Sequence, residues 1–215
     1  MRTVREIYSA YRIMPSLGLH QLRVAAVAKT ICDNFPEPLD KREILVACLL
    51  HDMGNIIKFD LNYFPEHLKP EGLEYWQKVK DEYVEKYGRS EHHATQTIAR
   101  EAGISERAFL YLCAVGYQNL EHALRDASFE KKICAYADMR VNPYGVCSIE
   151  ERISEGRNRY AGRKDKEMSP ERLQTLDDAL RELERQIFGK MKIKPEDISE
   201  EGSKNIIAEL EDFKI

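Results

Sequence analysis

Apolar residues recur along this chain at intervals of three and four, the spacing of helices that bury one face. No stretch of strand length alternates apolar and polar residues. The pattern therefore predicts an all-α protein. We expect its helices at about residues 4–14, 19–33, 40–53, 71–87, 90–102, 105–116 and 128–141, with another opening at 148 and a long one at 170–188.

Polar residues mark several helix starts. Asp40 with Glu43, and Ser148 with Glu151, fit the capping box, in which two side chains satisfy free backbone groups at a helix N-terminus. Ser169 precedes Pro170, a residue favoured at the first helical position. Residues 142–145 predict a turn. We divide the chain into a helical domain at 1–150 and a C-terminal helical extension at 151–215, packed on that domain.

The helix expected at 170–188 has an apolar stripe, which packs either on its own domain or against a second copy of the chain. We favour packing on the domain, and a homodimer stays open as the alternative. The stripe consists of Leu173, Leu176, Leu180, Leu183 and Ile187.

At 215 residues and 43% hydrophobic content, the chain is long enough for a substantial core. Its longest apolar run, 44–50, is too short to cross a bilayer, and residues 1–6 lack the apolar stretch of a signal peptide. We expect a cytoplasmic protein with no membrane partner. The five cysteines form no close-spaced pair, which favours reduced core thiols over a disulfide or a zinc-thiolate site.

The 33 Lys and Arg residues against 37 Asp and Glu give a net charge of −4, which argues against nucleic acid as a partner. A small phosphorylated substrate needs only a few local cations and is compatible with this charge. The segment 156–166 is locally basic. It is either a phosphate-binding or nucleic-acid-binding loop or a solvated connection between helices, and we favour the connection.

The pair His51-Asp52 closes the apolar run 44–50, with Gly54 as the expected helix C-cap. A buried carboxylate without a positive partner is costly, and the run contains no Lys or Arg. A bound cation would neutralise it, whereas a partly exposed helix end would need none. Because neighbouring helical residues point about 100° apart, an ion held by both would lie just beyond the helix end.

Two other apolar helices carry residues of the same kind. His20 lies in the first turn of the helix expected at 19–33, and Asp138 is the only acidic residue of the apolar run 133–141. A single buried histidine is more often a core residue than a ligand. Three buried helices that each carry a ligand-type residue favour one shared metal site.

In this order, His20, the pair His51-Asp52 and Asp138 resemble the pattern of the HD superfamily of metal-dependent phosphohydrolases. The flanking Arg23-Val24 and Tyr136-Ala137 agree with it, and the resemblance spans about 17–141. It implies an HD-domain helical bundle in which these four residues bind a divalent ion (Mn, Fe, Co, Ni or Zn). It also implies hydrolysis of a phosphomonoester or nucleotide.

Two departures from the family pattern matter. Many dinuclear members carry further histidines, but Tyr117, Gln118 and Asn119 stand where one is expected, so we expect one metal ion per chain. Asn55 stands where some members have a lysine and others a glutamate that assists the attacking water, so neither role carries over.

The remaining roles concern the substrate. Phosphoryl transfer needs cations near the phosphate oxygens, and Lys58 and Arg23 are our candidates. Each has an alternative: Lys58 as a surface lysine, Arg23 in a structural salt bridge. His92 would contact phosphate, and His93 would donate a proton to the leaving group, although the two could exchange these roles. Asp52 would orient water besides binding metal.

Two other functions remain open. One is a regulatory HD module that binds a nucleotide without turnover, and the complete ligand set argues against it. The other is an HD-type oxygenase with two irons, and the histidine missing near Gln118 argues against it.

Overall fold

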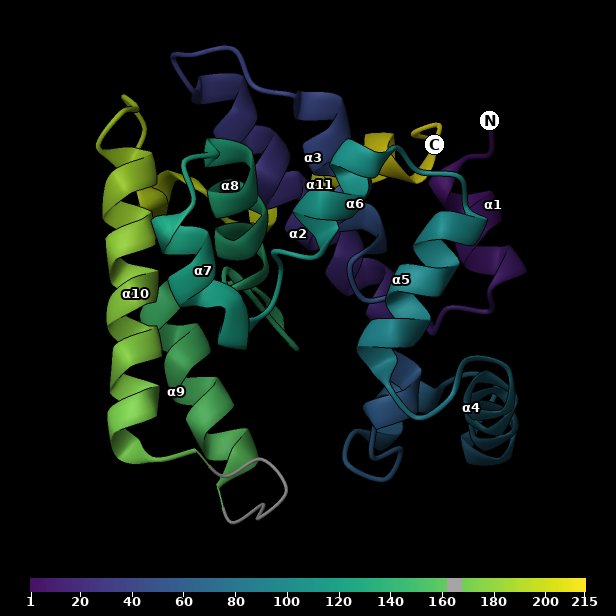
Figure 1. The fold of residues 1–215 in the computed structure, drawn as a ribbon. Helices are drawn as coiled ribbons and strands as arrows, with labels where there is room; N and C mark the ends of the chain where they lie inside the picture. Colours follow the sequence, from purple (N-terminus) through teal and green to yellow (C-terminus); the bar gives the residue numbers. More distant parts are fainter. Residues whose placement is uncertain (162–167) are drawn as a thin grey trace.

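The computed structural model describes residues 1–161 and 168–215, and nearly all the regular secondary structure in this part of the chain is helical, as expected (Figure 1). Its only sheet, within the described residues, is a two-stranded hairpin. The elements are α1 (Val4–Ala10), α2 (Pro15–Asn34), α3 (Lys41–Leu50), η1 (Asn55–Lys58), η2 (Pro65–Leu68), α4 (Leu73–Tyr87), α5 (Glu91–Glu101), α6 (Glu106–Leu112), η3 (Tyr117–Asn119), α7 (Leu120–Arg125), α8 (Phe129–Asp138), β1 (Val141–Asn142), β2 (Gly145–Val146), α9 (Ile149–Tyr160), α10 (Pro170–Phe188), η5 (Pro195–Asp197) and α11 (Glu200–Glu211).

The helices α2, α3 and α8 pack against one another at the centre of the molecule. Residues 24–28 of α2, 44–50 of α3 and 133–137 of α8 are all buried. Alanines at 25, 26 and 28 let the neighbouring helices approach α2 closely, and close packing contributes much of the stability of a helical core. All four predicted ligands lie on these three helices or directly after them.

The C-terminal helices cover this core. The apolar stripe of α10 packs on α7 and α8, with Leu176, Leu180, Leu183 and Ile187 fully buried, so it packs on its own domain as we expected. The helix α11, which the sequence pattern did not predict, packs against α2. Residue 150, our boundary between domain and extension, lies in the first turn of α9.

Several helix ends differ from the predictions. Pro15 opens α2 instead of separating two helices, because proline fits the first helical position, and His20 therefore lies in the second turn. The expected capping box at Asp40 is wrong: Asp40 pairs with Arg107, and Glu43 accepts a hydrogen bond from the Ser105 hydroxyl. The capping box at Ser148 and the cap at Ser169 are confirmed.

The turn predicted at 142–145 is the tip of the β1–β2 hairpin, in which Val141 pairs with Val146. The Asn142 side chain holds it by accepting hydrogen bonds from the backbone nitrogens of Tyr144 and Gly145. The basic segment is helical at 156–160, where it belongs to α9, and residues 162–166 lie outside the described part. None of the described helices combines the length and apolar character needed to cross a membrane.

Candidate metal centre

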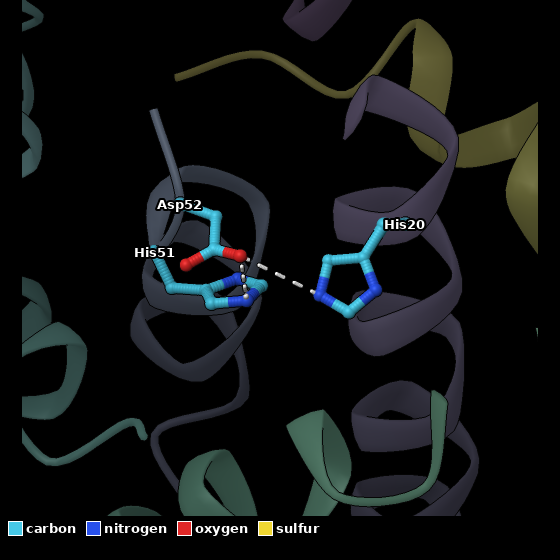
Figure 2. Close-up of side chains that lie close together, drawn as sticks. All are labelled: His20, His51 and Asp52. Atoms are coloured by element: carbon cyan, nitrogen blue, oxygen red, sulfur yellow. Dashed lines mark ion pairs between the residues drawn. The ribbon is translucent and has the colours of Figure 1, made fainter. Parts of the chain in front are cut away.

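The four residues predicted as ligands converge on one point between α2, α3 and α8. His20 comes from α2, His51 and Asp52 directly follow α3, and Asp138 is the last residue of α8. The Asp138 Oδ1 oxygen lies 3.2 Å from His20 Nε2 and 3.4 Å from His51 Nε2. Figure 2 shows the Asp52 carboxylate beside both imidazoles, with Oδ2 at 3.7 Å from His20 Nε2 and 3.6 Å from His51 Nε2.

The turn that carries His51 and Asp52 is held against α5. The helix α3 ends at Leu50, three residues earlier than expected, and Gly54 is not a left-handed cap, since its φ and ψ are −95° and −1°. Glycine is required for another reason: a Cβ at Gly54 would lie 2.5 Å from the carbonyl oxygen of Glu91. The Gly54 amide donates a 2.9 Å hydrogen bond to Thr95 Oγ1. This contact fixes where the ligand pair stands.

His51 is the most deeply buried of the four, with 1% of its side chain exposed. Its Nδ1 lies 2.7 Å from the Cys48 carbonyl oxygen. Because a carbonyl only accepts hydrogen bonds, Nδ1 carries a proton. Within the described structure, Nε2 has no hydrogen-bond partner. A buried, unpartnered nitrogen that faces two carboxylates, on a ring oriented by a backbone carbonyl, is what a metal-binding histidine requires.

The charges in this cluster are strongly coupled. Burial by itself lowers the pKa of His51, but the carboxylates of Asp52 and Asp138 outweigh it and raise that pKa to about 10. Burial raises the pKa of Asp138, but His20 and His51 outweigh it and hold that pKa well below its usual range. In the absence of an ion, a proton on His51 therefore supplies the positive charge that a metal would bring.

Gln21, which the sequence analysis did not single out, supports the site. Its side chain is fully buried, and its Oε1 oxygen accepts a 3.1 Å hydrogen bond from the backbone nitrogen of Asp52. The residue after His20 thus ties α2 to the turn that carries the other two ligands. The sequence does contain a signal for it, a polar residue within the apolar pattern of residues 17–28.

The residues predicted to handle the substrate lie outside this cluster. Lys58 Nζ is 3.9 Å from Glu91 Oε1, and the mostly exposed His92 has its Nε2 3.8 Å from the same oxygen. His93 is exposed in the first turn of α5. In the described part of the chain, no hydrogen bond or ion pair joins Lys58, His92 or His93 to the four clustered residues. Arg23 forms an ion pair with Glu200 of α11, which is the alternative that we considered for it.

The described residues contain one group of side chains close enough together to hold an ion, His20 with His51 and Asp52. Asp138 stands beside both imidazoles of this group. Tyr117, one of the three residues in the segment where we expected a further histidine in dinuclear members, donates a 2.7 Å hydrogen bond to Asp177 of α10. The group of His20, His51 and Asp52 could therefore hold a metal ion.

A helical bundle that gathers two imidazoles and two carboxylates around one point defines an all-helical protein with a candidate metal site. The family model of the HD domain matches residues 17–139, more than half of the chain, and the chain belongs to this family. HD domains bind divalent metals and are typical of metal-dependent phosphohydrolases. No match was found among curated proteins or among solved structures.

Proposed function

We propose that this protein is a metal-dependent phosphohydrolase that hydrolyses a phosphomonoester or a nucleotide. The observation that carries the proposal is the unpartnered Nε2 of buried His51, which faces two carboxylates. A divalent ion held between this nitrogen and the two carboxylates would balance their charge, as the proton on His51 does in the metal-free protein. Membership of the HD family supplies the reaction class.

The ligand set is His20, His51, Asp52 and Asp138. Two imidazole nitrogens and carboxylate oxygens suit Mn, Fe, Co, Ni or Zn, and three of the four residues lie close enough together to hold such an ion. When bound, a divalent ion supplies the positive charge that polarises a phosphate oxygen and makes water a stronger nucleophile.

The chain's own residues supply orientation and proton transfer. Asp52 has 22% of its side chain exposed against 1% for His51, so it is the more accessible of the two. Its carboxylate accepts a hydrogen bond from the attacking water and holds that water toward the phosphorus. The Cys48 carbonyl holds the ring of His51, and Gln21 holds the backbone of Asp52. The Asp52 carboxylate that accepts the hydrogen bond from water is therefore held in a defined position.

The phosphate is neutralised by Lys58, which is only weakly held by Glu91 and has about a third of its side chain exposed. Arg23 takes part only if phosphate competes with Glu200 for its guanidinium group. His93, which has no side-chain partner among the described residues, donates the proton to the leaving group, and His92 contacts the phosphate from the same turn of α5.

The test is release of inorganic phosphate from a panel of nucleotides and phosphomonoesters, with Mn²⁺, Co²⁺ or Ni²⁺ added to the full chain. We expect turnover that depends on the metal and stops with EDTA. Binding of a nucleotide without phosphate release would support the regulatory module instead. Metal-independent turnover that survives loss of both His51 and Asp138 would contradict the proposal.

A further inference from the structure

Glu200, the first residue of α11, uses both of its carboxylate oxygens to join two separate elements. Its Oε1 accepts hydrogen bonds from Arg23 of α2, at 2.9 Å from Nε and 2.5 Å from Nη2. Its Oε2 accepts a 2.8 Å hydrogen bond from the backbone nitrogen of Val146 in β2. A Cβ at Gly145 would lie 2.9 Å from this Oε2, so a larger residue there would require the end of the Glu200 side chain to shift.

Both joined elements lead directly to ligands of the candidate metal centre. Arg23 lies one helical turn after His20 on α2. Val146 pairs with Val141, and β1 begins three residues after Asp138. His20 and Asp138 are themselves the closest pair in the centre, at 3.2 Å. We infer that Glu200 is a positioning residue of the metal centre, and that α11 sets the spacing between His20 and Asp138 through it.

A second contact ties the same two regions together. Arg140, two residues after Asp138, is almost fully buried, and its Nη2 donates hydrogen bonds of 3.1 Å to the carbonyl oxygens of Pro195 and Ile198. The segment before α11 is thereby fixed to the end of α8. Glu200 extends this attachment across to α2. The C-terminal segment is therefore part of the support of the site, in addition to covering the core.

The chemistry of the contact requires a carboxylate. Arg23 and the Val146 amide are both donors, so each oxygen of the residue between them must accept. In Glu200→Gln the side chain keeps its length, but its amide nitrogen must face one of these donors. The variant therefore loses either the hydrogen bonds from Arg23 or the one from the Val146 nitrogen, while the volume of the side chain hardly changes. Glu201→Gln is a matched control, because Glu201 is the next residue, is 82% exposed and pairs only with Lys204 in the described structure.

The inference rests on the proposed metal centre, so the experiment has a readout with metal and one without. Calorimetric titration of the full-length, metal-free chain with Mn²⁺ should show roughly tenfold weaker binding by Glu200→Gln, at the lower end of what supporting residues of metal ligands contribute. Glu201→Gln should bind like the wild type. In metal-free protein labelled at histidine, the imidazole NMR signals of His20 should move in Glu200→Gln and not in Glu201→Gln.

Wild-type metal affinity and unmoved His20 signals in Glu200→Gln would overturn the inference, as would equal effects of the two variants. If Glu200→Gln does not fold, Arg23→Lys replaces it: it keeps the charge, loses the paired donors and should give a smaller loss in the same direction. A wild-type chain that binds none of Mn²⁺, Co²⁺, Ni²⁺ and Zn²⁺ would refute the metal centre, while the His20 signals would still decide whether Glu200 positions that residue.

Discussion

His51 is oriented by Cys48: the Nδ1 nitrogen of the imidazole donates a 2.7 Å hydrogen bond to the carbonyl oxygen one helical turn before it. Only Nε2 is then left to face Asp52 and Asp138. The backbone of α3 thus determines which nitrogen faces the cluster, and loss of the Nε2 proton leaves a lone pair that already points at the two carboxylates.

The first prediction concerns pH. The pKa of His51 is about 10 in the folded, metal-free protein against an ordinary value of 6.5. Below 6.5 the ring is protonated in the folded and unfolded states, and its stabilising contribution is complete. The contribution is lost as the pH rises from 6.5 to 10. Urea denaturation of metal-free protein should show this loss, and His51→Gln should lack it. Metal affinity should rise over the same interval, because the ion displaces the proton.

The second prediction concerns metal content. Wild-type protein should retain about one divalent transition-metal ion per chain, and Asp138→Asn should lose it while keeping its helical circular dichroism. The reason is that a neutral amide cannot balance the ion's charge in a buried site. Elemental analysis after dialysis measures this, with the exposed Asp178→Asn as the control. Undiminished metal in Asp138→Asn would remove Asp138 from the ligand set.

The third prediction concerns catalysis. Asp52→Asn keeps the size of the side chain but loses the charge that binds metal and accepts a hydrogen bond from water. Because several kcal/mol of transition-state stabilisation are at stake, phosphate release should fall by roughly 100-fold or more. The assay is run at saturating metal. Near-normal turnover would show that Asp52 is neither an essential ligand nor the residue that orients water.

The fourth prediction distinguishes a role in substrate binding from a role in metal binding. Lys58→Ala should raise KM for the phosphorylated substrate by roughly tenfold, the value of one charge-assisted hydrogen bond. Its metal content should equal that of the wild type, because a contact to phosphate acts on the substrate. Lys78→Ala, which removes an exposed lysine of α4, is the control. Unchanged kcat and KM would make Lys58 a surface lysine.

The fifth prediction concerns the turn after α3. Gly54→Ala would place its Cβ against the backbone of α5, so it should lower the free energy of unfolding by roughly 1–3 kcal/mol. It should also weaken metal binding, because His51 and Asp52 stand on the displaced turn. Gly156→Ala is the comparison: its Cβ would meet only the flexible end of Arg152, at 3.4 Å, and stability should not fall. Equal stability of the two variants would contradict the close contact at Gly54.

The sequence was sufficient to single out the four clustered residues because each is a polar residue within, or directly after, a strongly apolar run. This signal depends only on neighbouring residues in the sequence, so it can be recognised without knowing the fold. The same holds for the caps at Ser148 and Ser169, where the side chain bonds to a backbone nitrogen three residues away.

The sequence pattern did not predict contacts between side chains that are far apart along the chain. Asp40 and Glu43 have the spacing of a capping box, but Arg107 and Ser105 take up their carboxylates instead. Gly54 was misinterpreted because a helix cap and a close helix contact both select glycine. The helix α11 was not predicted, and Leu210 is its only fully buried large apolar residue. The position of α11 is set by its packing against α2, which the local sequence pattern does not reveal.

The separation between Arg23 and Glu200, 177 positions along the chain, has a consequence for the order of folding. Contacts within and between α2 and α3 join residues that are near in sequence, so they form early. A pairing across 177 positions forms late, after most of the chain has folded. The spacing of His20 and Asp138 is then completed in the final stage of folding. In a refolding experiment, tight capture of a metal ion would report that the whole chain, and not only its helical nucleus, has reached the native state.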